Sequence, residues 1–300
     1  MISEQASISA ILRLHRQWLS DPTTGRRADL SGVTLNEADL PGIGLSKAIL
    51  SRATLLDTNL ADADLSGARL DRADLQRANL AGADLTGADL SEADLSGAWL
   101  EGAGLAEASA PYASFRKARL GEARMAGASF RNAIFRGAWA ARAALHQARF
   151  YDADCQDADF SQAQFYHALL QHVRFVSATA FSANFGGSKI DHCDFSGADL
   201  RGARLVRAEI IQCSFRDAKL ADCDFHEARL RGGDFNRAVL AGVRFGGAQL
   251  RTADFRGANL RGARDLTPDQ LLSAMTDHST ILPNGSNGPY LRFSGAEKPR

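Results

Sequence analysis

The sequence predicts an all-β solenoid, a quadrilateral parallel β-helix of about twelve coils with a short α-helical cap at each end. Three observations support this fold class. A large apolar residue recurs at nearly every fifth position from Leu30 to Leu260, with Ala at 110, 140 and 180. A small residue stands two positions before nearly every one of them, and the register never slips between these limits. An α-helix repeats its apolar stripe every three or four residues and a flat strand alternates every two, so neither accommodates this spacing.

Each five-residue unit forms one side of a coil. Of the 47 large positions, Leu takes 26 and Phe takes 14, and Ala fills 37 of the 47 small positions. These two positions point inward, and the three between them are mostly small or polar residues that turn readily. Four sides close a coil. Successive coils stack about 4.8 Å apart and are joined by parallel backbone hydrogen bonds. The expected core of this stack includes Leu85, Leu90, Leu95, Phe195, Phe215 and Phe235.

Both ends of the repeat are predicted to be capped. An amphipathic segment that Pro22 ends predicts a helix near the N-terminus, and Thr267, Pro268 and Gln270 form the pattern of a capping box near the other end. Such helices cover the apolar ends of a coil stack. The alternative is that one of these terminal caps forms the interface of a homodimer. The expected parts are a capping helix and linker (1–27), the β-helix (28–264), a C-terminal capping helix (265–283) and a flexible tail (284–300).

Motifs such as ADLSG at residues 93–97 and ANLAG at residues 78–82 follow the pattern A-(D/N)-L-x-x. In this pattern, over about four-fifths of its length, the chain resembles the pentapeptide-repeat family. The resemblance implies that the quadrilateral β-helix is right-handed. It also implies one specific activity, because some family members bind bacterial DNA gyrase or topoisomerase IV and protect it from inhibitors. Those members resemble duplex DNA in width, shape and negative charge.

Composition argues against several classes of protein. Lys plus Arg equals Asp plus Glu at 35 each, so the net charge favours neither a nucleic-acid partner nor a membrane. Arg13, His15 and Arg16 interrupt the first apolar stretch, which therefore does not resemble a secretory signal, and no apolar run is long enough to span a membrane. The four cysteines lack metal-binding spacing, and we interpret His172 and His192 as a ladder on a solvated face. We expect a cytoplasmic protein without a cofactor or metal.

Nothing in the repeat favours catalysis. Aspartate is abundant because its position is an outward one beside a turn, so paired carboxylates follow from the period rather than from a reaction. A filled coil leaves no concave pocket, and the sequence shows no Gly-rich phosphate loop and no nucleophile with a base. We therefore predict no catalytic residues. The favoured function is a rigid, non-enzymatic scaffold for protein–protein interaction through flat solenoid faces.

The candidate residues for partner binding are aromatic or acidic. Trp99, Trp139 and Phe181 fall on one low-charge face of the predicted coil, which indicates a docking surface, although packing against a tail is an open alternative. Between residues 28 and 107, fourteen acidic side chains outnumber five basic ones. Through the family resemblance, this excess implies a DNA-mimicking modulator of DNA gyrase or topoisomerase IV that confers antibiotic resistance. The acidic candidates are Asp64, Asp74, Asp84, Asp89 and Asp94.

Charge reverses in the rest of the repeat. Residues 108–264 carry twenty-three basic and fifteen acidic side chains. Nucleic-acid binding by these basic coils is therefore a second alternative, which interspersed acids such as Asp222, Asp224 and Glu227 weaken. An unidentified protein partner is the favoured hypothesis.

Overall fold

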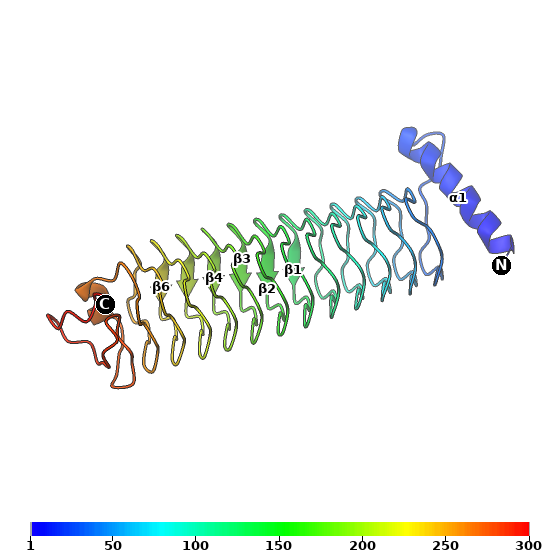
Figure 1. Cartoon of the computed structure of the whole chain (residues 1–300). Helices are drawn as coiled ribbons and strands as arrows, with labels where there is room; N and C mark the ends of the chain where they lie inside the picture. Colours follow the sequence, from blue (N-terminus) through cyan, green and yellow to red (C-terminus); the bar gives the residue numbers. More distant parts are fainter. Residues whose placement is uncertain (1, 300) are drawn as a thin grey trace. The chain divides into compact units, whose positions relative to one another are not determined.

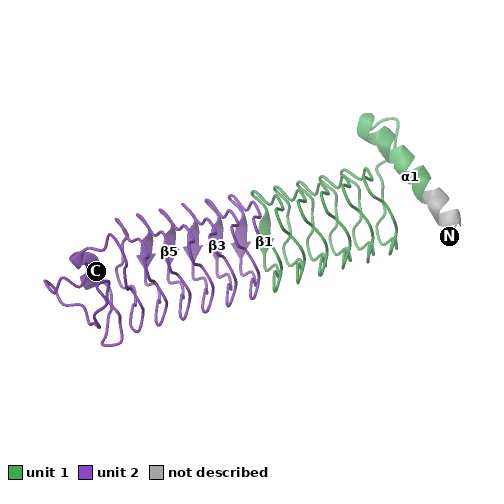
Figure 2. Cartoon of the chain, in the orientation of Figure 1, with its two compact units in different colours: residues 1–139 green, residues 140–300 purple. Residues whose placement is uncertain are grey.

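The computed structural model describes the backbone of residues 2–299 and the side chains from residue 8 to residue 299. The chain forms two compact units, residues 1–139 and residues 140–300 (Figure 2). In both units the backbone winds into stacked coils, and the residue at a given corner is followed by its counterpart on the next coil twenty residues later. The predicted parallel solenoid with short helices is therefore confirmed.

Unit 1 begins with α1 (Ile2–Ser20) and continues as coils that single parallel bridges hold together. Each bridge joins two successive coils through two short hydrogen bonds. At Asp84, for example, the amide donates to Ala63 O at 2.8 Å, and the carbonyl accepts from Leu65 N at 2.7 Å. Among the described residues of this unit, only β1 (Ser129–Arg131) is a regular strand.

Unit 2 contains the regular sheet. Its strands follow one another in sequence order (Figure 1). They pair in parallel, with Phe150 opposite Leu170 and Ile190 opposite Ile210. The regular strands mark about five turns of the solenoid, fewer than the twelve coils expected. Most five-residue sides have only one bridging residue between their corners, which is too short to count as a strand. Helix α2 (Pro268–Ser273) follows the last coil. The strands are β2 (Arg149–Tyr151), β3 (Leu169–Gln171), β4 (Lys189–Asp191), β5 (Glu209–Ile211) and β6 (Arg229–Arg231).

The inward residues form the core of each unit. Their side chains are fully buried at Leu85, Leu90, Leu95, Phe195, Phe215 and Phe235. In unit 2 the ring of Phe195 is stacked between Phe175 and Phe215, with centroid distances of 4.7 and 5.1 Å. Phe235 extends this column at 4.8 Å from Phe215. Each such side chain contributes about 1.5–3 kcal/mol through burial, so the axis is the main source of stability.

The corners explain the abundance of Asp and Gly on the surface. The residue two positions after each large one has a positive φ, which Gly adopts without strain. At Gly82 (φ 67°) a Cβ would also collide with the carboxylate of Asp62. The Asp before the large residue stabilises the same corner, because its carboxylate accepts from the amide two residues later, as Asp84 does from Thr86 N at 2.9 Å.

The capping box predicted at the C-terminal end is present. The side chain of Thr267 accepts from Gln270 N at 3.2 Å, and Thr267 N donates to the side chain of Gln270 at 2.7 Å. Gln270 Nε2 also donates to Phe245 O and Ala248 O, both at 2.8 Å. One side chain therefore starts α2 and satisfies two carbonyl groups of the coil beneath it.

Beyond α2 the chain continues to pair with the preceding coil. Met275 N donates to Ala253 O at 2.8 Å, and Ile281 N donates to Ala258 O at 2.9 Å. Leu260 N in turn donates to Ile281 O at 2.8 Å. These bonds occupy the backbone edge of the last repeat coil. Neither described helix is long and apolar enough to cross a membrane.

Candidate interaction surface

Trp99, Arg119 and Trp139 occupy equivalent positions on three successive coils of unit 1, and we call them the Trp–Arg–Trp stack. Parallel bridges join Trp99 to Arg119 and Arg119 to Trp139. The guanidinium carbon of Arg119 lies 5.2 Å from the ring centroid of Trp99 and 5.3 Å from that of Trp139. Both indoles therefore contact the same cation, an arrangement that cation–π attraction stabilises.

The stack is solvent-exposed. Trp99 retains 48% and Trp139 57% of its full accessible surface. The side chain of Arg119 is about as exposed, and its guanidinium lies 4.0 Å from the carboxylate of Glu101. An ion pair at this distance and exposure contributes little to stability. The surface thus presents two large apolar rings and a cation whose ion pair with Glu101 is long and exposed.

The backbone beneath the stack is fixed. The carbonyl of Trp99 accepts from Leu80 N, and that of Arg119 accepts from Leu100 N, both at 2.7 Å. Because the guanidinium also holds the two rings, these side chains have little rotamer freedom left to lose on binding. Trp and Arg are the residue types most enriched at the energetic centres of protein interfaces. The stack is therefore a candidate docking site.

Sequence reasoning identified both tryptophans but missed Arg119. The signal was present at the longer period, since Arg119 stands twenty residues after Trp99 and twenty before Trp139. The third aromatic candidate, Phe181, lies in unit 2, where it is exposed and Arg201 lies 6.0 Å from its ring centroid. It therefore belongs to a separate aromatic–arginine pair.

The five acidic candidates all serve as corner acceptors. Each carboxylate accepts from the backbone amide two residues later, at 2.9–3.1 Å. The side chain and amide of Thr86 hold the pKa of Asp84 below its ordinary value. These aspartates therefore have a structural role that needs no partner. The pairs are Asp64 with Ser66, Asp74 with Gln76, Asp84 with Thr86, Asp89 with Ser91, and Asp94 with Ser96.

Many arginines of unit 2 are paired with carboxylates. The distances from guanidinium nitrogen to carboxylate oxygen are 2.6–2.7 Å in four of these pairs. The guanidinium of Arg237 accordingly lowers the pKa of Asp217. Such pairing reduces the positive charge that these coils offer to phosphates. The four pairs are Arg201 with Asp199, Arg207 with Glu227, Arg237 with Asp217, and Arg256 with Asp254.

The imidazoles of His172 and His192 lie one above the other, with ring centroids 5.1 Å apart. His192 Nδ1 is 2.7 Å from a carboxylate oxygen of Asp191. Within the described residues, no group of three or more His, Cys, Asp or Glu side chains is placed to hold a metal. All four cysteines are free and buried, and burial raises the pKa of the Cys155 and Cys193 thiols well above the ordinary value.

Five-residue sides, an apolar axis and an exposed side-chain ladder define a repeat solenoid. Two family models match almost the whole repeat, one described as "Pentapeptide repeats (8 copies)" and the other as "Pentapeptide repeats (9 copies)". The chain belongs to the pentapeptide-repeat family. The first model matches residues 28–67, 68–105, 141–176, 158–197, 181–217, 198–237, 218–257 and 234–264, and the second matches residues 110–154.

Solved structures similar to this chain are also pentapeptide-repeat proteins. HetL of the cyanobacterium Nostoc sp. strain PCC 7120, involved in heterocyst differentiation regulation, is 26% identical with a TM-score of 0.22, over 90% of this chain and 97% of HetL. Full-length QnrB1, a plasmid-mediated fluoroquinolone resistance protein, is 19% identical with a TM-score of 0.23, over 63% and 91%. A thylakoid-lumen protein of Arabidopsis thaliana is 32% identical with a TM-score of 0.19, over 30% and 68%. Comparison with curated proteins finds no match.

Proposed function

We propose that this protein is a non-enzymatic scaffold that binds a protein partner through the Trp–Arg–Trp stack. One observation carries the proposal, namely that Arg119 lies between two exposed indole rings at 5.2 and 5.3 Å. Exposed aromatic side chains that cluster on one face are typical of a protein interaction site. The rigid coil provides the ordered geometry that lowers the entropic cost of that contact.

DNA mimicry directed at DNA gyrase or topoisomerase IV receives less support. It requires carboxylates displayed for a partner, whereas the five candidate aspartates accept hydrogen bonds from their own corners. Nucleic-acid binding by the basic coils is similarly weakened, since arginines such as Arg207 and Arg237 are paired with acids. We also propose a cytoplasmic setting, because free buried thiols are typical of reducing compartments.

The proposal is tested by affinity capture from an extract of the native host. The bait is the full chain, compared with a Trp99→Ala/Trp139→Ala variant. Tyr112→Ala is the matched control, because Tyr112 is also an aromatic residue of unit 1 and is 58% exposed. We expect recovery of the specific partner to fall at least about tenfold for the double variant, which corresponds to about 1.4 kcal/mol, and to stay unchanged for the control. Equal recovery by a correctly folded double variant contradicts the proposal.

A further inference from the structure

The first coil of unit 1 is only partly covered. Ala28, Leu30, Leu35 and Leu45 are buried, and Ala28 N donates to His15 Nδ1 on α1. Four other inward residues of this coil remain half-buried, namely Val33, Ala38, Leu40 and Ile43. Their counterparts one coil later are fully buried, namely Ala53, Thr58, Leu60 and Ala63. An apolar edge at residues 33–43 is therefore left open to solvent.

The backbone of the same edge is also unpaired. One coil later, the amides of Thr54 and Asn59 donate to Val33 O and Ala38 O at 2.9 and 2.8 Å. The corresponding amides of the first coil, at Thr34, Asp39 and Gly44, find no backbone acceptor within residues 2–299. Thr34, Asp39 and Gly44 are solvent-exposed, and such an uncovered end of a coil stack is a surface that another chain can cover.

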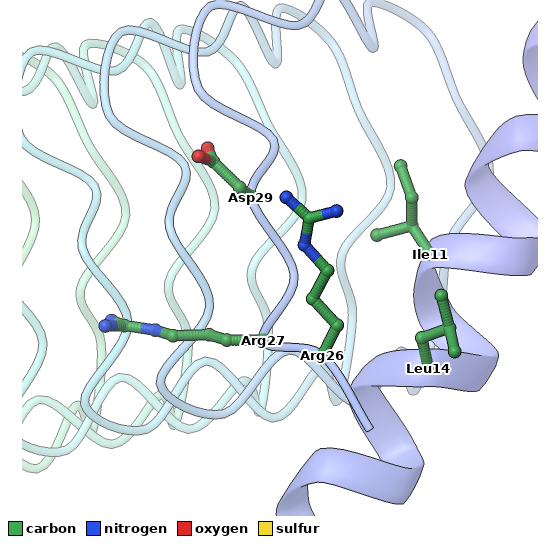
Figure 3. Close-up of a pocket in the computed structure, with 5 residues that line it drawn as sticks. All are labelled: Ile11, Leu14, Arg26, Arg27 and Asp29. Carbon is green, nitrogen blue, oxygen red and sulfur yellow. The ribbon is translucent and has the colours of Figure 1, made fainter. Parts of the chain in front are cut away.

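Helix α1 stands beside this edge without sealing it. Its C-terminal half is anchored, because Arg26 N donates to Leu14 O at 3.0 Å and Ala28 N donates to His15 Nδ1 at 3.1 Å. Further toward the N-terminus, Ile11 and Leu14 line one wall of a pocket (Figure 3). Its other lining residues, Arg26, Arg27 and Asp29, come from the start of the first coil. The apolar face of α1 remains half-buried at Ile8, Ile11, Leu12 and Leu14.

The helix and the coil edge carry opposite charges. Exposed bases lie on α1 at Arg13 and Arg16 and after it at Arg26, where Asp21 is also exposed, whereas the exposed charged residues of the open edge are the acids Glu37 and Asp39. A patch that combines a basic apolar helix with an acidic apolar edge is complementary to a second copy of itself. Two-fold symmetry pairs each element with the other one of the partner copy.

We propose that this N-terminal end is a homodimer interface. The apolar face of α1 in each copy packs over the open edge of the second copy, at residues 33–43. Arg13 and Arg16 of one copy meet Glu37 and Asp39 of the other. The occupant is thus a second copy of this chain, and the contact is independent of the Trp–Arg–Trp stack.

Sedimentation equilibrium of the full chain tests this interface. We expect a concentration-dependent species of twice the 32.2 kDa chain mass. Ile11→Glu should raise the dimer dissociation constant at least about tenfold. Its matched control is Leu272→Glu on α2, where the side chain is 44% exposed, and this variant should leave the dimer unchanged.

A charge-reversal pair separates dimer loss from misfolding. Arg13→Glu/Arg16→Glu should weaken the dimer. Adding Glu37→Arg/Asp39→Arg in the same chain should restore it, because opposite charges then meet again across the interface. All four positions are exposed, so these substitutions should not disturb the fold of either copy. A wild-type chain that stays monomeric at all soluble concentrations overturns the proposal. Loss of the dimer in Leu272→Glu also overturns it. So does a dimer that is unaffected by both Ile11→Glu and the charge reversals.

Discussion

Arg119 contacts the indole rings of both Trp99 and Trp139, and this shared cation links three successive coils on the exposed face of unit 1. The contact depends on the twenty residues of one full coil rather than on the five of one side. Outward residues that are twenty positions apart lie next to one another on neighbouring coils. A change at the central residue therefore acts on both aromatic side chains together.

Arg119→Ala should release the two indoles without disturbing the coil. An exposed cation–π contact is worth about 0.5–1 kcal/mol, so the free energy of unfolding should fall by about 1–2 kcal/mol at most. We expect altered near-ultraviolet circular dichroism of the tryptophans and weaker partner capture. Arg116→Ala on the same coil is the control, because among the described residues the guanidinium of Arg116 makes only a 3.4 Å contact with Ser114 Oγ. Identical tryptophan spectra for both variants would contradict the stacked arrangement.

Replacing corner aspartates by asparagine should preserve the fold. Asn79 already fills such a corner, where its side-chain oxygen accepts from Ala81 N at 3.2 Å. Asp84→Asn and Asp94→Asn should therefore leave the melting temperature nearly unchanged, whereas the corresponding alanine variants should each lose about 0.5–1.5 kcal/mol. Partner capture by the asparagine variants separates the two functional hypotheses. Retained capture fits a structural role for the acids, and its loss in stable protein would favour DNA mimicry.

Phe195 tests the inward assignment in unit 2. Phe195→Ala should cost about 3–5 kcal/mol, because it leaves a cavity between the rings of Phe175 and Phe215. Phe195→Asp should be more severe, since it places an unpaired charge on a dry axis. Denaturant unfolding gives the loss of stability, and hydrogen exchange should show faster opening of β3, β4 and β5. A wild-type unfolding curve for either variant refutes the assignment.

The anchor of α1 should weaken in mild acid. Burial lowers the pKa of His15 below its ordinary value of 6.5, and Arg27 acts in the same direction, whereas the Ser46 carbonyl and Asp64 oppose it. The unfolded imidazole therefore takes up a proton that the folded one resists. The neutral ring's contribution to stability is complete above pH 6.5 and declines as the pH falls below 6.5 toward the lowered pKa.

Hydrogen exchange at the Ala28 amide, measured above and below pH 6.5 and corrected for intrinsic rates, checks this linkage. Ala28 N donates to His15 Nδ1, so protonation of that nitrogen removes the acceptor. In His15→Gln the side chain cannot titrate, and protection should not depend on pH. Equal pH dependence in the variant would mean that another group controls the anchor.

The period of five predicts the core and the corners because each residue's role depends on its place within one side. The identity of Leu90 or Phe215 as an inward residue follows from position alone. A coil of four sides also places Arg119 between the two tryptophans, but the repeat does not show that its guanidinium contacts both rings, because that depends on the rotamers. The pairing of Arg237 with Asp217 and the open edge at residues 33–43 depend on rotamers and on the angle of α1, which a repeat pattern does not specify.

Site-specific photo-crosslinking tests most directly the claim that the Trp–Arg–Trp stack contacts the partner. A photo-reactive amino acid replaces either Trp99 or Tyr112 in the full chain, which is irradiated in an extract of the native host. We expect a discrete crosslinked partner from position 99 that excess wild-type protein competes away, and no such product from position 112. Crosslinking of the same partner from position 112 but not from position 99 would contradict it.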